Sequence, residues 1–190
     1  MMKKLLLVVL VLAMVLGSSA ALAENMGVKV IGGPETETEP VSLDDLKLGE
    51  EAEIDGYALI KPLRFSWEDI LDYISPGVVQ SRFQSGSDAQ YACLVTDITN
   101  TQFESRNFLT DCTVKVIFDD MYEYAGWFYQ YQKDSTKVLY DSNDFFSIDP
   151  LFAGHYVFGA TLPNLVVESD KSLAMVIIID GNEITYNIRK

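Results

Sequence analysis

Histidine and cysteine are scarce in this sequence, which has only His155, Cys93 and Cys112. A hydrolase that uses Ser or Cys as nucleophile needs an imidazole as general base, and no G-x-S-x-G motif accompanies His155. Zinc sites in proteins draw on several Cys or His ligands. The sequence therefore predicts neither a histidine-dependent hydrolase nor a zinc cofactor, and it places His155 at the edge of a turn after Ala153-Gly154.

Basic residues are also few, with 14 Lys and Arg against 28 Asp and Glu and a net charge of −14. Proteins that bind nucleic acid or anionic lipid use clusters of Lys and Arg. We therefore expect no nucleic-acid partner and no attraction to anionic membranes. Outside a cell, this charge would keep the protein soluble.

Residues 1–23 have the three parts of a secretory signal peptide. Lys3 and Lys4 precede the apolar run Leu5–Leu16, and small residues lead to Ala23. The run is shorter than the roughly 20 residues that a membrane-spanning helix needs. The sequence has neither a cysteine for lipidation near this site nor a wall-sorting signal at its end, so we expect a secreted protein. Removal of residues 1–23 leaves 12 basic and 28 acidic residues, a net charge of −16.

Residues 24–45 are predicted to form a disordered acidic arm, because the segment Glu35–Pro40 alternates Glu and Thr before a proline. Residues 46–190 are long enough for one domain with a hydrophobic core.

Short apolar segments separated by turns indicate an all-β domain. The clearest strands are predicted at 89–100, 112–118 and 173–179, and the last is joined by Asp180-Gly181-Asn182 to a final strand. Ser66 begins a segment with Trp67, Ile70, Leu71 and Ile74 at helical spacing, which predicts one short helix, and residues 81–87 are predicted to form a loop. We expect an immunoglobulin-like antiparallel β-sandwich with one short helix.

The segment 89–100, the strand around Phe118, the loop 150–154 leading into Tyr156 and the closing hairpin resemble the telokin-like, immunoglobulin-like extracellular domains of Gram-positive bacteria. The resemblance covers roughly residues 50–188. It implies a sandwich fold in a secreted or surface protein of unassigned role. It brings no catalytic residues with it.

Cys93 and Cys112 are candidates for a disulfide, because export would place them where such a bond persists. Cys112 shares its strand parity with Val114, Val116 and Phe118, which predicts that it points into the core. Two buried free thiols are the alternative.

A calcium site is a second possibility outside the cell. Asp141, Asn143, Asp144 and Asp149 place oxygen ligands close together in sequence. They lack the spacing of an EF-hand, so a solvated polar loop is the alternative reading. We otherwise expect no cofactor.

The most aromatic segment offers a candidate carbohydrate platform, because sugar rings stack on exposed Trp and Tyr faces. Alternation predicts that Trp127, Tyr129 and Tyr131 share one side of a strand, and Tyr122 and Tyr124 lie just before them. Gln130 and Gln132 lie on the opposite side. This arrangement favours the alternative, in which the Trp and Tyr side chains belong to the core.

The leading hypothesis is a non-enzymatic, immunoglobulin-like extracellular module that binds an extracellular protein or glycan, a protein in the first place, through an edge strand or the loops at one end. A carbohydrate-binding module is the first alternative, and a glycan is then the partner. A hydrolase using paired carboxylates is the second, because acidic residues are plentiful, although they lie mostly in turns.

Overall fold

The computed structural model describes residues 43–74, 80–131, 137–139 and 147–190. All of them belong to the second of two compact units, Glu39–Lys190. A short 3-10 helix, Leu43–Asp45, is followed by thirteen strands and one short α-helix. Their bounds are β1 Ala52–Ile54, β2 Ala58–Glu68, β3 Ile70–Ile74, β4 Gln80–Gln84, β5 Ala89–Asn100, β6 Arg106–Asn107, β7 Cys112–Phe118, β8 Tyr122–Tyr131, β9 Lys137–Leu139, β10 Ser147–Ile148, β11 Ala153–Pro163, α2 Asn164–Val167, β12 Leu173–Ile179 and β13 Asn182–Arg189.

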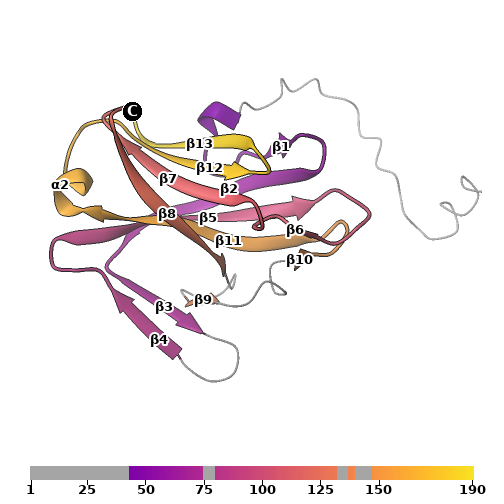
Figure 1. Ribbon diagram of the computed structural model, residues 1–190, viewed down its shortest axis with the longest axis horizontal. Coiled ribbons are helices and arrows are strands. Elements are labelled where there is room, and N and C mark those ends of the chain that lie inside the picture. Colours follow the sequence, from indigo (N-terminus) through magenta and orange to yellow (C-terminus); the bar gives the residue numbers. More distant parts are fainter. Residues whose placement is uncertain (1–42, 75–79, 132–136, 140–146) are drawn as a thin grey trace, which may run out of the picture. The chain divides into compact units, whose positions relative to one another are not determined.

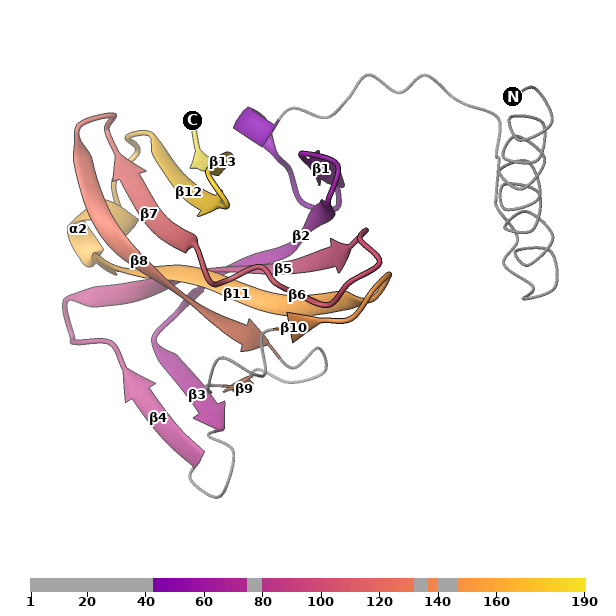
Figure 2. The same ribbon diagram turned by 45° about the vertical axis from the view of Figure 1, so that its right-hand side comes forward.

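The strands form two layers that share β8. Hydrogen-bonded neighbours follow the order β1-β2-β5-β11-β8-β7-β12-β13. The later half of β8 pairs with β11, and its first half pairs with β7. Figures 1 and 2 show β7, β12 and β13 stacked against the layer of β2, β5 and β11. The predicted antiparallel β-sandwich is therefore confirmed, with β3 and β9 as a parallel pair beside it.

The main core lies between the two layers and is built by strand alternation. On β5, Ala92, Leu94 and Ile98 face this core, and on β11 Phe158 does so. All four are almost completely buried, as are Val116 and Ile177 of the facing layer. Burial of the larger of these side chains contributes about 1.5–3 kcal/mol each to folding, so the alternation specifies the register of both central strands.

A second, smaller apolar cluster lies on the other face of β5 and β11. Its buried members are Leu71, Cys93, Val95 and Val157, with the rings of Tyr91, Trp127 and Tyr129 packed against them. Leu71 comes from β3, which leaves the sandwich and pairs with β4 in a projecting hairpin (Figure 1). Where β3 covers them, β5 and β11 thus carry apolar side chains on both faces, towards the main core on one side and towards the second cluster on the other.

The helix predicted from Ser66 to Ile74 is wrong, because this segment is extended. Through Glu68 it continues β2, where Trp67 pairs with Ala92 of β5. Phe65 and Trp67 both pack against the main core. Residues two apart lie on the same face of a strand, whereas in a helix they would point in different directions. Pairing with the long edge of β5 outweighs the local helical pattern of this segment.

The loop predicted at residues 81–87 is also wrong in part, because Gln80–Gln84 forms β4. The other strand predictions are confirmed, with β5, β7 and β12 at the expected bounds. Asp180 and Gly181 have φ of 49° and 83°, which is the backbone of a type I′ turn. That geometry explains why this Asp-Gly pair joins β12 to β13.

The disulfide between Cys93 and Cys112 is not formed, and both thiols are free. Cys93 belongs to the second cluster, whereas Cys112 packs against the main core. The two side chains therefore lie in different cores, and sequence parity could not reveal this because it does not relate one strand to another. The inward orientation predicted for Cys112 is confirmed.

These buried thiols predict a loss of stability at alkaline pH. Burial raises the pKa of Cys93 and of Cys112 from 9.0 to about 12. Between about pH 9 and 12, the unfolded chain therefore binds fewer protons than the folded one, and the free energy of unfolding falls by up to about 1.4 kcal/mol per pH unit for each thiol. Urea unfolding at pH 7.5, 9 and 10.5 measures the slope. The double variant Cys93→Ala/Cys112→Ala should show a shallower decline, and an equal slope would contradict the assignment.

Candidate functional site

Asn100, the last residue of β5, fixes two loops at one end of the sandwich. Its side chain is fully buried. The amide Nδ2 donates to the carbonyl oxygens of Glu104 at 2.7 Å and Ile148 at 3.0 Å, and Oδ1 accepts from the backbone N–H of Gln102 at 2.9 Å. Its backbone N–H donates to Phe152 O at 2.9 Å. Residues 101–105 and 149–152, which we call the loop end, are thus held by one residue, through both its side chain and its backbone.

The loop end exposes three large apolar side chains. Phe103 is 87% exposed, Leu151 66% and Phe152 67%. Single exposed apolar residues are common on protein surfaces, but these three stand on two loops that Asn100 joins. Such a group is typical of an interaction surface.

A hollow of about 460 Å³ is lined, among the described residues, by residues 102–106, which include Phe103. The Gln102 side chain donates to Gly56 O at 3.1 Å, and Ser105 donates to Asp149 at 2.8 Å. These bonds tie the loop to the β1–β2 turn and to the second loop. The two bonds therefore hold Gln102 and Ser105, two of the lining residues, in place.

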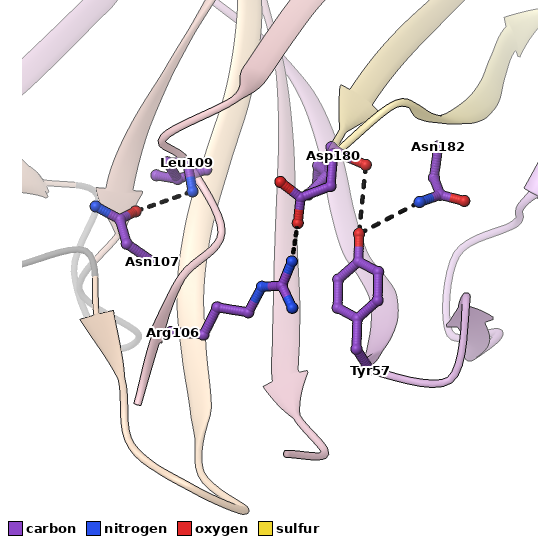
Figure 3. A network of polar contacts seen from close by, with 7 residues as sticks. Tyr57, Arg106, Asn107, Leu109, Asp180 and Asn182 are labelled. Atoms are coloured by element: carbon purple, nitrogen blue, oxygen red, sulfur yellow. Dashed lines mark hydrogen bonds and ion pairs between the residues drawn. The ribbon is translucent and has the colours of Figure 1, made fainter. Parts of the chain in front are cut away.

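Arg106, which lines the hollow, contacts Asp180 and Tyr57. Figure 3 shows its guanidinium pointing at the Asp180 carboxylate, with which it forms an ion pair. The same guanidinium lies 4.2 Å from the centre of the Tyr57 ring, a cation–π contact. Burial, followed by the Asp180 charge, raises the pKa of Tyr57. Since Arg106 is paired, it is committed to joining β6 to the β12–β13 turn.

Tyr57 and its neighbours complete this support. The ring of Tyr57 stacks on Phe108 with a centroid distance of 6.0 Å, and its hydroxyl donates to Ile179 O at 3.4 Å. Asn182 donates to the same hydroxyl at 3.4 Å, and the Leu109 N–H donates to Asn107 Oδ1 at 2.9 Å (Figure 3). These contacts are structural, and they hold the base of the loop end against the main core.

The five aromatic residues of the candidate carbohydrate platform do not share one face. Trp127 and Tyr129 pack against the second cluster, with their ring centroids 5.3 Å apart. Tyr122 is 55% exposed at the start of β8, and Tyr124 packs against the main core. Tyr131 ends β8. Of the four whose side chains the structure describes, Trp127 and Tyr129 lie together, and both rings are half-buried.

The candidate calcium ligands are placed only in part. Asp141, Asn143 and Asp144 lie outside the described residues, and Asp149 is an exposed residue of the loop end. Its carboxylate accepts a hydrogen bond from Ser105. Within the described part of the chain, no group of three or more His, Cys, Asp or Glu could hold a metal ion.

His155 pairs with Asp97 across β11 and β5, where the two residues are direct neighbours in the ladder. Both side chains are about three-quarters or more buried. They lie on the same face of the sheet as Val157, by strand alternation. The contact is a cross-strand side-chain hydrogen bond between directly opposed residues, of the kind that stabilises antiparallel sheets.

Sequence reasoning missed the apolar residues of the loop end. Phe103 follows a polar turn, and Leu151-Phe152 follows Asp149-Pro150. Large apolar residues inside turn sequences were the available signal, because turns normally carry polar or small side chains. Their proximity could not be predicted, since it depends on Asn100 reaching from one loop to the other.

Comparisons with known proteins agree with the fold. No protein-family model matches the sequence, and no curated protein matches it. An uncharacterized β-sandwich protein from Clostridium difficile is similar in structure, with a TM-score of 0.62 and 22% sequence identity over 82% of this chain and 100% of that one. A conserved hypothetical protein from Bacillus anthracis has a TM-score of 0.49 and 8% identity, covering 76% of this chain and 95% of that one. The chain is a β-sandwich protein with an uncharacterized structural neighbour.

Proposed function

We propose that this chain is a secreted, non-enzymatic module that binds a protein partner through the loop end. The observation that supports it is the exposure of Phe103, Leu151 and Phe152 on two loops held by Asn100. The signal-like pattern of residues 1–23 supports the part of the proposal that the binding occurs outside the cell. An immunoglobulin-like role of this kind also fits the resemblance to extracellular domains.

A prearranged loop end favours binding. Ordering a flexible loop on association lowers affinity, and a loop already held by hydrogen bonds avoids much of that loss. Here each loop has at least two bonds to Asn100 or to its neighbour loop. Aromatic side chains on a fixed frame are typical of the residues that dominate protein–protein affinity.

The other candidate functions have weaker support. Trp127 and Tyr129 pack on each other and on the second cluster, which leaves less ring surface for a sugar. The carboxylates described around the loop end lie on its surface or pair with Arg106, so they do not converge as a hydrolase requires. We therefore place neither function ahead of protein binding.

The triple variant Phe103→Ser/Leu151→Ser/Phe152→Ser tests the proposal. We expect the wild-type protein, used as bait on the culture medium and cell surface of its own organism, to retain a defined protein that the triple variant loses by at least tenfold. The folded state should persist, because all three side chains are mostly exposed. Quantitative mass spectrometry of the retained proteins measures the effect.

The matched control is Met121→Ser/Leu165→Ser, which removes two exposed apolar residues (71% and 83%) from the opposite end. It should retain the same protein as the wild type. Retention that the triple variant leaves unchanged would contradict binding through the loop end.

A further inference from the structure

Leu151 has an unusual backbone conformation for its residue type. The N–H of Phe152 donates to Asp149 O at 3.1 Å, which closes a β-turn with Pro150 and Leu151 at its centre. Leu151 has a φ of 63°. The third position of a type II turn requires such a positive φ and favours Gly or Asn, whereas a leucine there is strained.

The surrounding structure holds Leu151 in this conformation. Its N–H donates to Asn100 O at 3.0 Å, and the N–H of Asn100 donates to Phe152 O at 2.9 Å. Packing does not explain the leucine, because two-thirds of it is exposed. A strained residue that is over-determined by its neighbours and contributes little to the core points to a role in binding.

The charged residues of the described segments around the loop end are nearly all acidic. Segments 53–57, 100–111, 147–154 and 179–183 meet at this end of the sandwich through the bonds of Asn100, Gln102 and Arg106. Together they contain seven acidic residues, Glu53, Asp55, Glu104, Asp111, Asp149, Asp180 and Glu183, and one basic residue, Arg106. Arg106 is paired with Asp180. The apolar side chains therefore stand within an acidic rim.

We propose that Leu151 is the anchor of the binding surface and that the partner is a protein segment with an apolar site flanked by Lys and Arg. This inference rests on the proposed function and specifies its partner. Charge complementarity across a rim speeds association and selects partners, while an apolar anchor at the centre slows dissociation. The same acidic rim repels anionic lipid, so a protein segment fits better than a membrane.

A peptide selection with the full-length protein tests the inference. Random twelve-residue peptides displayed on phage are selected on the immobilised protein, and the enriched peptides are synthesised and measured by fluorescence anisotropy. We expect enriched peptides to combine at least two Lys or Arg with aromatic or aliphatic residues. Their affinity should fall several-fold when the salt concentration rises from 50 to 300 mM, because rim charges are screened.

The variant Leu151→Gly separates the anchor from the fold. Glycine accepts a positive φ without strain, so we expect the melting temperature to rise by about 3 °C while peptide affinity falls at least tenfold. Leu165→Ser, at the opposite end, should leave the affinity unchanged, and Glu104→Gln should lower it several-fold.

Distinct results overturn the inference. Unchanged affinity in Leu151→Gly, or a selection without any Leu151-dependent peptide, removes Leu151 as anchor. Enriched peptides that bind the loop end without basic residues overturn the partner's charge but leave the proposed function standing. Leu151-dependent binding to phosphatidylcholine vesicles, without binding to basic apolar peptides, would assign the surface to lipid instead.

Discussion

Asn100→Ala should lower the free energy of unfolding by about 3 kcal/mol, since it removes three hydrogen bonds, one buried and two partly buried, and leaves their backbone groups without these partners. The carbonyl oxygens of Glu104 and Ile148 lose their donor, and the N–H of Gln102 loses its acceptor. The side chain is fully buried, so water cannot easily replace these bonds. Urea unfolding followed by circular dichroism measures the change.

The isosteric variant Asn100→Asp separates the hydrogen bonds from the volume of the side chain. Aspartate keeps the acceptor for Gln102 but turns the donor into an oxygen that faces two carbonyl groups. A buried, uncompensated charge is costly, so Asn100→Asp should destabilise at least as much as Asn100→Ala. Asn182→Ala, which removes one long hydrogen bond to Tyr57, should stay below about 1 kcal/mol. If Asn100→Ala matched this control, Asn100 would not be holding the loops.

Much of the fold could be predicted because its strongest signals are local. The alternation within β5 and β7, and the Asp-Gly turn between β12 and β13, follow from side-chain periodicity and backbone preference alone. The helix predicted for segment 66–74 was wrong for the opposite reason. Its spacing fits a helix equally well, and pairing with other strands makes it extended. Residues 66–68 pair with β5, more than twenty residues further along the chain, and residues 70–74 pair with β4.

The candidate site was less predictable because it depends on contacts between loops. The aromatic segment of β8 attracted attention through composition, yet its residues divide between the two faces of the strand. Phe103 and Leu151 carry no pattern that relates them, and Asn100 joins their loops through bonds to backbone atoms. Backbone acceptors are present in every sequence, so such a junction leaves no trace in residue type.

The two apolar clusters meet at β11, and there a glycine determines how Trp127 can lie. Gly159 pairs with Trp127 on one side and with Cys93 of β5 on the other. A Cβ at this position would stand 2.4 Å from Trp127 Cη2 and 2.7 Å from the backbone oxygen of Ala92. The indole ring therefore rests on the bare backbone of β11, and this contact keeps it within the second cluster.

Gly159→Ala should consequently lower the free energy of unfolding by about 3 kcal/mol, because overpacking against a large ring and a backbone oxygen forces both strands to shift. Urea unfolding measures the loss, and a change in Trp127 fluorescence should accompany it. Gly86→Ala is the matched control, since its Cβ would meet only the exposed Asp88 side chain at 3.1 Å, and it should change stability by less than about 0.5 kcal/mol.

A second substitution identifies the source of the loss. Trp127→Leu in the Gly159→Ala background should recover part of the stability, because the shorter side chain no longer meets the new methyl group, although the Ala92 oxygen still does. Unchanged stability in Gly159→Ala alone would mean that the indole ring moves aside freely. A freely moving Trp127 could turn its face to solvent. That result would favour the carbohydrate platform, rather than the loop end, as the binding site.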